Sequence, residues 1–144
     1  MASGRAEGAS LVTGGVRPTD PALAEGAYLM PAVFDHMGPD MRISREEIFG
    51  PVVGITPFDT EEEALRLANA SPYGLSGSIW SRDMAKALRA TKALKSGVIS
   101  VNCNNSVHVE APFGGYKQSG IGRELGMEAL ELYTELKNVF VDIS

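Results

Sequence analysis

The fold is decided by the stretch VVGITPFDTEEEALRLANASPYGLSGSIWS, residues 52–81, because it predicts a strand, a helix and a second strand in succession. Residues 52–58 are an apolar run typical of a buried strand. Thr60 as N-cap, with Glu63 three residues later, is the signature of a helix start, and an apolar stripe at helical spacing follows it. Residues 75–81 indicate the next strand, after a turn that contains Pro and Gly.

The same pattern repeats toward the C-terminus. Residues 82–97 predict a helix that stops at Gly97, and residues 98–102 predict a third buried strand. The helix positions expected to face inward are Met84, Ala87, Leu88, Thr91 and Leu94. Alternating strands and helices predict an α/β fold, in which parallel βαβ units place helices on the faces of a sheet through right-handed crossovers.

The upstream segments are less regular. We expect a short helix over residues 2–8 and a strand over residues 10–15. A loop rich in Pro and small residues separates them from a strand over residues 28–35. Pro31 lacks a backbone N–H, so it favours an edge strand or an irregular extended segment there.

The downstream segments begin with a long irregular stretch, residues 103–120, directly after the third predicted strand. Ligands of open α/β sheets bind outside the carboxyl ends of the strands, so this stretch is a candidate binding region. A helix over residues 123–135 and a strand over residues 138–143 are expected to follow. Because a free apolar edge strand invites aggregation, we expect this last strand to pair with another part of a larger protein or with another subunit.

Composition narrows the classes of partner. The chain has 144 residues, 44% hydrophobic and 22% charged, and its formal net charge is −5 without a basic stripe. This charge disfavours nucleic acid and anionic membrane as partners. No apolar run approaches the ~20 residues of a membrane-spanning helix, and the first ten residues do not resemble a signal peptide. With a single cysteine, Cys103, the chain has no internal disulfide, and we expect a cytoplasmic protein.

Residues 45–53, REEIFGPVV, place two carboxylates directly before an aromatic residue and a Gly-Pro pair. Gly50 tolerates φ > 0 and Pro51 fixes φ near −65°, so the pair predicts a rigid turn at the mouth of a strand. Loops in such positions often carry binding residues. On local chemistry alone, the simpler interpretation is that Glu46 and Glu47 are solvated surface charges.

Four strings occur in order along the chain: REEIFGPVVGITPF, ANASPYGLSGSIWSRD, SGVISVN and APFGGYKQSGIGRELG. Together they closely resemble the C-terminal part of the NAD(P)-dependent aldehyde dehydrogenase superfamily. The upstream strings EGASLVTGG and GAYLMPAVFD are similar to the segment that precedes EEIFGP in that family, so the resemblance covers nearly the whole chain. It implies a partial catalytic domain over residues 1–136, built of parallel βαβ units, and an oligomerisation strand over residues 137–144.

The resemblance also implies a cofactor contact. In the family, the second glutamate of EEIFGP, here Glu47, hydrogen-bonds the ribose on the nicotinamide side of NAD or NADP, and the aromatic residue, here Phe49, lies against the nicotinamide region. A carboxylate suits the first role because its two oxygens accept hydrogen bonds from two vicinal hydroxyls. Glu46 is expected to be structural or solvated. The residue that distinguishes NAD from NADP lies outside the matched region.

The segment before the family's PFGG string helps to line the aldehyde pocket. Carried over by position, the resemblance implies Val107 and Phe113 as pocket residues, with Asn105 and Ser106 as further candidates. His108 is interpreted as a solvent-exposed loop residue, and no metal site is expected. The glycines of residues 120–126 do not have the spacing of a phosphate-binding loop, so they predict a tight connection into the final helix.

The parts of the family's chemistry that this chain lacks are equally informative. The reaction needs a cysteine thiolate that attacks the aldehyde and a glutamate that assists hydrolysis of the resulting thioester. The family's Gly-Gln-x-Cys context is absent, and Cys103 falls at a different landmark, where it is interpreted as a small residue near the pocket. No catalytic residue is therefore assigned. We expect the chain alone to be inactive on aldehydes and to bind cofactor weakly.

Three functional interpretations stay open at this point. The chain is part of an aldehyde dehydrogenase that works only in a full-length or split complex. Alternatively, it is a non-catalytic module that joins intact aldehyde dehydrogenase subunits through its C-terminal strand, as a homo-oligomer or a mixed complex. The third interpretation is a truncated remnant without independent function. The aldehyde, and a dimer or tetramer as the assembly, are not specified by the sequence.

Overall fold

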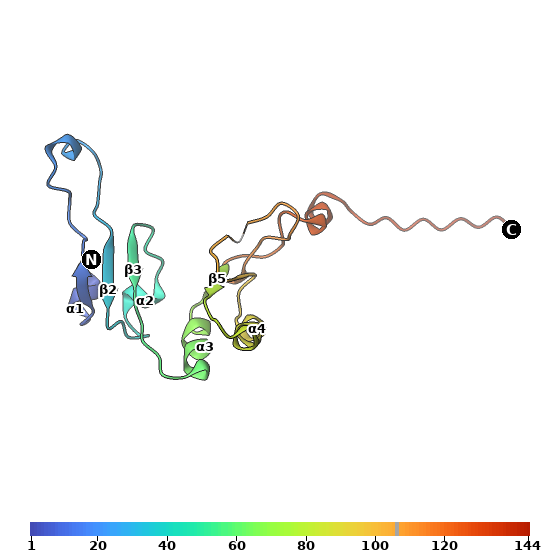
Figure 1. The fold of residues 1–144 in the computed structure, drawn as a ribbon. Helices are drawn as coiled ribbons and strands as arrows, with labels where there is room; N and C mark the ends of the chain where they lie inside the picture. Colours follow the sequence, from blue (N-terminus) through green and yellow to red (C-terminus); the bar gives the residue numbers. More distant parts are fainter. Residues whose placement is uncertain (106) are drawn as a thin grey trace. The chain divides into compact units, whose positions relative to one another are not determined.

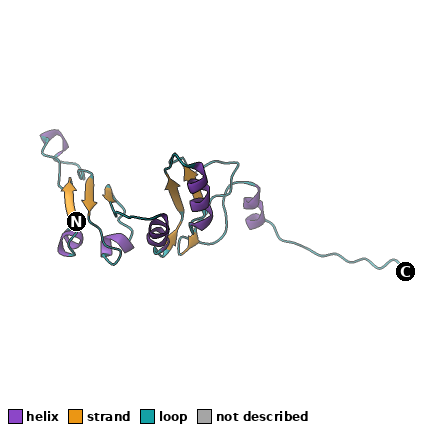
Figure 2. Ribbon diagram, turned by 60° about the horizontal axis from the view of Figure 1, so that its bottom comes forward, coloured by secondary structure: helices purple, strands orange, loops and turns teal. Residues whose placement is uncertain are grey.

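The structure is a computed structural model that describes residues 1–105 and 107–144. These residues form two compact units, residues 1–70 and residues 71–144. Figure 2 shows helices, strands and loops alternating along the chain. The predicted mixed α/β class is therefore confirmed, although the strands are distributed over separate sheets.

The first unit contains a three-stranded sheet in the order β1-β2-β3. Its strands are β1 (Ser10–Thr13), β2 (Ala32–Asp35) and β3 (Val52–Gly54), and its helices are α1 (Ala2–Ala6), η1 (Pro21–Leu23), α2 (Arg42–Arg45) and α3 (Glu61–Asn69). β1 is antiparallel to β2, and β2 is parallel to β3. In Figure 1, β2 and β3 lie side by side with α2 between them in the chain, so this pair is one parallel βαβ unit.

The core of the first unit is small and centres on Phe34, whose side chain is fully buried. Ala9 and Ile43 pack with it, so β2, the end of the α1–β1 connection and α2 meet in one cluster. Burial of a phenylalanine side chain contributes about 1.5–3 kcal/mol. This cluster fixes α2, and therefore the start of the segment that follows α2, against the sheet.

The second unit contains two two-stranded sheets, β4 with β7 and β5 with β6. Its elements are β4 (Tyr73–Gly74), β5 (Ser76–Ile79), α4 (Met84–Ala93), β6 (Val98–Val101), β7 (Tyr116–Lys117) and the 3-10 helix η2 (Met127–Tyr133). β5 and β6 are parallel, with α4 as the connection between them. This is the second parallel βαβ unit, and it matches the predicted strand–helix–strand succession.

Both predicted helices of the central stretch form, with caps that the chemistry explains. The Thr60 hydroxyl accepts a hydrogen bond from the Glu63 N–H at 3.1 Å, as predicted, and the Glu63 carboxylate accepts one from the Asp59 N–H at 2.9 Å. The start of α4 is capped by Asp83, which accepts from the Lys86 N–H at 3.1 Å. Capping by these side chains satisfies N–H groups that have no partner inside the helix.

Several boundaries differ from the expectations. The predicted buried strand of residues 52–58 is ordered as a strand only over β3, and the side chain of Val53 is 57% exposed. β3 pairs with β2, within the first unit. Of the two alternatives for residues 28–35, the edge strand is wrong, because β2 is the central strand of its sheet, whereas residues 28–31 do form an irregular segment. Pro31 is tolerated because it stands just before β2 and its missing N–H is not needed in the ladder.

The helical expectations also need correction at two places. α4 ends at Ala93, before Gly97, and of its predicted inward positions only Ala87 is buried, whereas Met84 and Leu88 are more than half exposed. The predicted helix over residues 123–135 is the shorter 3-10 helix η2. In both cases the apolar face has little of the described chain to cover it, and packing supplies most helical stability.

The predicted last strand has no partner in the described chain. Residues 134–144 have no regular secondary structure, and Figure 1 traces them as a bare line beyond η2. Their large apolar side chains are exposed, including Phe140 at 88% and Ile143 at 93%. A strand exists only when its N–H and C=O groups are paired, so the pairing of residues 137–144 with another chain stays a prediction.

Candidate functional site

The segment after α2 carries the predicted cofactor residues, Glu47 and Phe49. α2 ends at Arg45 and is followed by Glu46, whose carboxylate forms an ion pair with Arg42 at 2.7 Å, one helical turn earlier. Both side chains are more than half exposed, so the pair contributes little stability. Glu46, expected to be structural or solvated, is therefore an exposed residue with one local contact. The carboxylate of Glu47 is exposed and forms no hydrogen bond or ion pair with the described residues.

Phe49 is one of the most exposed apolar side chains of the described chain, at 97%. It borders a cavity of about 370 Å³ whose wall comes from the N-terminus, α2 and residues 46–49. The cavity is lined by Met1, Ser3, Arg42, Ile43, Glu46, Glu47, Ile48 and Phe49. Glu47 and Phe49 are therefore brought together on one hollow of the first unit, with the acidic and the aromatic group both accessible.

The turn at Gly50 and Pro51 forms, but not for the reason predicted. The Gly50 N–H donates to the Ile48 carbonyl at 2.7 Å, and the Val52 N–H donates to the Gly50 carbonyl at 2.8 Å. Gly50 does not adopt a positive φ, and a Cβ there would meet no atom within 4 Å. The tight turn therefore rests on two short main-chain hydrogen bonds and the fixed φ of Pro51, and not on the conformational freedom of glycine.

The position of this segment on the sheet is also informative. The Pro51 carbonyl accepts a hydrogen bond from the Ala32 N–H at 2.8 Å, at the start of the parallel β2–β3 pair. Glu47 and Phe49 thus precede the amino end of β3. The general rule that ligands bind at carboxyl ends of strands does not account for their location.

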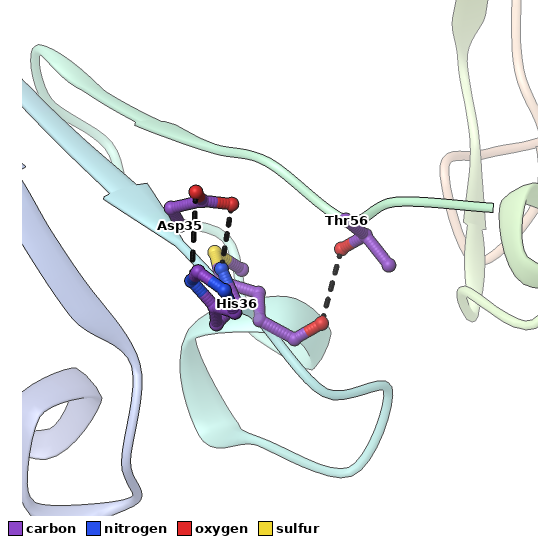
Figure 3. A network of polar contacts seen from close by, with 4 residues as sticks. Asp35, His36 and Thr56 are labelled. Carbon is purple, nitrogen blue, oxygen red and sulfur yellow. Dashed lines mark hydrogen bonds and ion pairs between the residues drawn. The ribbon is translucent and has the colours of Figure 1, made fainter.

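A polar cluster that the sequence did not indicate occupies the carboxyl end of β2 (Figure 3). The Asp35 carboxylate accepts from the His36 N–H at 2.7 Å and lies 3.5 Å from His36 Nδ1, while the Thr56 hydroxyl donates to the Met37 carbonyl at 3.3 Å. His36 has a φ of 56° and a side chain that is 77% exposed. These contacts close the turn after β2, and the exposed side-chain contact between Asp35 and His36 adds little.

The predicted pocket residues lie in the second unit, on the segment that follows β6. Val107 is 56% exposed, and Phe113 is half-buried. Phe113 is fixed through its main chain, because its N–H donates to the Glu124 carbonyl at 2.7 Å and the Glu124 N–H donates back at 2.8 Å. Asn105 is exposed, and Ser106 lies outside the described residues.

The remaining candidates of this segment are exposed. His108 is a loop residue whose carbonyl accepts from the Ala111 N–H at 3.1 Å, which agrees with its interpretation as a solvent-facing position. The thiol of Cys103 is free and exposed. Within the described ranges, no group of three or more His, Cys, Asp or Glu side chains is arranged to hold a metal ion.

The beginning of this segment is fixed by a side chain that the sequence analysis did not single out. Asn102 follows β6 with a φ of 56°, a conformation that asparagine adopts more readily than most residues. Its side-chain oxygen accepts from the Ser81 N–H at 2.8 Å, and its amide nitrogen donates to the Ser81 carbonyl at 3.0 Å. These bonds tie the carboxyl end of β6 to that of β5. The asparagine directly after an apolar strand was the available signal.

Two further cavities do not include any predicted site residue. A cavity of about 790 Å³ in the first unit is lined by residues of α2, of α3 and of the loops next to them, among them Arg45, Phe58 and Arg66. A cavity of about 590 Å³ in the second unit lies beside Trp80, Met84 and Asn102. In the part of the chain that the structure describes, no helix is both long and apolar enough to cross a bilayer.

Comparison with known proteins identifies a matching family. The profile of the aldehyde dehydrogenase family matches residues 1–139. A betaine aldehyde dehydrogenase of Agrobacterium fabrum is 51% identical over 138 residues, which are 96% of this chain and 28% of that protein. One of Bacillus subtilis is 48% identical over 134 residues, 93% of this chain and 27% of that protein. The chain thus spans little more than a quarter of these relatives.

Solved structures agree with the sequence comparisons. The betaine aldehyde dehydrogenase of Staphylococcus aureus in complex with NAD+ matches with a TM-score of 0.90 and 48% identity, over 92% of this chain and 26% of that one. An aldehyde dehydrogenase of Bacillus cereus in an NAD+ complex matches with a TM-score of 0.92 and 45% identity, over 99% of this chain and 28% of that one.

Proposed function

The chain belongs to the aldehyde dehydrogenase family, and from that premise we propose that it is part of an NAD(P)+-dependent enzyme that oxidises an aldehyde to a carboxylic acid. In this proposal residues 1–136 are a portion of the catalytic domain and residues 137–144 an oligomerisation strand. The chain supplies the contact to the nicotinamide ribose and part of the aldehyde pocket. It does not oxidise aldehydes by itself, and it acts in the cytoplasm.

The observation that carries the proposal is the hollow that contains Glu47 and Phe49. An accessible carboxylate without a partner among the described residues is an acceptor that two vicinal hydroxyls can satisfy. Phe49, two residues later, is 97% exposed. Covering such an apolar side chain with a ligand or with another part of a protein is favourable, because it removes apolar surface from water. These residues therefore fit the nicotinamide-ribose end of the cofactor. Affinity is expected to be poor, because this contact engages only one end of the dinucleotide.

The residues of this chain have binding and orienting roles in the proposed mechanism. NAD(P)+, when bound, supplies the acceptor for the hydride that leaves the substrate carbon. Glu47 accepts hydrogen bonds from the ribose and so orients the nicotinamide end, and Phe49 limits where the ring lies. Val107 and Phe113 present apolar surface that excludes water from the aldehyde. The thiolate that the covalent step needs comes from outside these 144 residues, and Cys103 has no assigned role in it.

A complementation assay tests this function. The chain is mixed with the cysteine-bearing remainder of the Bacillus subtilis relative, and NADH formation is followed with betaine aldehyde, the substrate that the relative's name gives. We expect no activity from either part alone and measurable activity from the mixture. Activity of the chain alone, or an inactive mixture that nevertheless forms a complex, would contradict the proposal.

Neighbouring glutamates provide a matched pair of variants for the same assay. Glu47→Ala removes the proposed ribose acceptor and is expected to raise the KM for NAD+ roughly tenfold or more, as expected for lost hydrogen bonds to a charged group. Glu46→Ala removes a carboxylate one residue away that is bound to Arg42, and should leave this KM nearly unchanged. Equal effects of the two variants would remove the specific role of Glu47.

The second candidate function is a non-catalytic module that joins intact aldehyde dehydrogenase subunits. The exposed apolar side chains of residues 136–143 favour it, because an extended apolar segment can add to the edge of another sheet. Size-exclusion chromatography with light scattering, on the chain mixed with the intact relative, measures this directly. A stable mixed oligomer that loses its stability when residues 137–144 are removed supports the module, and an unchanged elution of both proteins rejects it.

A further inference from the structure

The proposed aldehyde pocket has a positioning residue that lies outside the pocket itself. Phe113 is followed by a glycine pair and β7, and the chain then turns back so that residues 122–124 lie against residues 113–116. We propose that Arg123 clamps these two segments together and thereby holds Phe113 in place. The clamp is a property of the described chain, whereas its consequence for the aldehyde rests on the proposed function.

The geometry of the Arg123 side chain supports the clamp. Its Nη1 donates to the carbonyl of Gly115 at 3.1 Å and to the carbonyl of Gly122 at 2.6 Å, so one nitrogen links the outgoing and the returning segment. Its guanidinium carbon lies 5.3 Å from the centre of the Tyr116 ring, within the range of a cation–π contact. Hydrogen bonds from a charged donor are stronger than neutral ones.

A glycine makes room for this side chain. A Cβ at Gly114 would lie 3.0 Å from Arg123 Cδ, 3.1 Å from its Nη1 and 2.7 Å from the carbonyl oxygen of Gly122. The Arg123 side chain therefore lies close beside the residue that follows Phe113, and a Cβ at that residue would crowd both this side chain and the Gly122 carbonyl oxygen. The side chain thus passes Gly114 and contacts Gly115 and Tyr116.

The clamp is anchored to the rest of the second unit through β7. Tyr116 pairs with Gly74 of β4, and the Ser119 hydroxyl accepts from the Gly74 N–H at 2.9 Å. Residues 113–124 are thus fastened to the strand that leads into β5.

Within the described chain, Arg123 forms no ion pair with an acidic side chain, so its charge is directed at main-chain carbonyls and an aromatic ring. Lysine would replace it only in part, because an ammonium can donate to the carbonyls but has no planar group that stacks on the Tyr116 ring at the same time.

Amide hydrogen exchange of the 144-residue chain tests the clamp without any assay of activity. We expect Arg123→Ala to accelerate exchange of the Phe113 and Glu124 amides roughly tenfold, while the Val98 amide, which bonds to Leu75, keeps its rate. Arg123→Lys should recover the native rates only in part. Arg82→Ala, a change at an exposed arginine of the same unit, is the matched control and should change neither amide.

Two results would overturn the clamp: native exchange rates in Arg123→Ala, or the same acceleration in the Arg82→Ala control. If Arg123→Ala unfolds the unit, the exchange rates of the Phe113 and Glu124 amides are compared between Arg123→Lys and the native chain. Native rates in Arg123→Lys would contradict the need for a guanidinium. In the complemented enzyme, Arg123→Lys should raise the KM for the aldehyde and leave that for NAD+ unchanged. An equal rise in both would reject the link to the pocket. If the unmodified chain, mixed with the cysteine-bearing remainder of the relative, shows no activity, that result contradicts the proposed function. The clamp is then tested by hydrogen exchange alone.

Discussion

The segment of residues 46–51 and the loop of residues 113–124 are held in opposite ways. The first projects an exposed carboxylate and an exposed ring, and it is fixed only at its two ends, by the Glu46–Arg42 pair and by short main-chain hydrogen bonds around Gly50 and Pro51. The second is fixed by a two-way main-chain pair, by the Arg123 side chain and by β7. The residues proposed for the pocket wall are thus held by contacts within their own unit, whereas the side chains of the proposed cofactor contact, Glu47 and Phe49, have no such support.

The largest expected effect concerns the packing behind the held loop. A Cβ at Gly97 would lie 1.7 Å from the carbonyl oxygen of Gly114 and 2.8 Å from its carbonyl carbon. Because these are backbone atoms, Gly97→Ala is expected to lower the free energy of unfolding of the second unit by about 3 kcal/mol. Urea unfolding, followed by the NMR amide signals of β5 and β6, measures the change. A loss below about 1 kcal/mol would show that the loop moves away easily and would weaken the comparison.

The next effect concerns the start of the same segment. Asn102→Ala removes two hydrogen bonds to Ser81 and also disfavours the positive φ, so we expect a loss of about 2 kcal/mol. Asn102→Gly removes the same bonds but accepts the φ, so its loss should be about 1 kcal/mol. The same unfolding experiment separates the contribution of the hydrogen bonds from that of the positive φ. Equal losses in Asn102→Ala and Asn102→Gly would show that the positive φ costs nothing.

The opposite region should tolerate an equivalent change. Gly50→Ala introduces a Cβ that meets no atom within 4 Å, at a residue without a positive φ. The variant is expected to be as stable as the native chain or more stable by up to about 1 kcal/mol, because alanine reduces the freedom of the unfolded chain. The measurement is urea unfolding followed by the amide signals of β2. A loss above about 1 kcal/mol would mean that the turn needs glycine after all.

The smallest expected effect on stability is that of Glu47→Gln. Its side chain is exposed and has no partner among the described residues, so the free energy of unfolding should change by less than about 0.5 kcal/mol. The same variant should weaken NAD+ use in the complemented enzyme, because an amide replaces one acceptor oxygen with a donor. If Glu47→Gln destabilised the first unit clearly, the residue would be structural, and the contrast between the two segments would disappear.

The sequence predicted elements better than it predicted their partners. Thr60 and Glu63 mark the start of α3 correctly because a cap is a local interaction. The pairing of β3 with β2, by contrast, depends on which strands lie next to each other, and periodicity carries no information about that. The exposed positions of α4, such as Leu88, were predicted to face inward because an apolar stripe indicates a face that packs, without indicating whether the packing partner is present.

For the candidate site, the sequence predicted which residues are involved but not the contacts that hold them. The string around Glu47 and Phe49 pointed to a binding turn, and the structure places both on one hollow. It did not indicate that Gly50 would be unstrained, because a Gly-Pro pair fits several turn geometries. Asn102 and Arg123 were missed because their partners, Ser81 and Gly115, are main-chain groups brought close only by the fold.

The pairing of β4 with β7 also sets an order of events during synthesis on the ribosome. The sheet of the first unit can close once Gly54 has emerged, whereas the Gly74 N–H waits for the hydroxyl of Ser119, 45 residues further on. At translation rates of about 5–20 residues per second, that wait lasts roughly 2–9 seconds. During this interval β4 is an unpaired edge beside a growing apolar chain, so the nascent second unit is the part that a chaperone would have to protect.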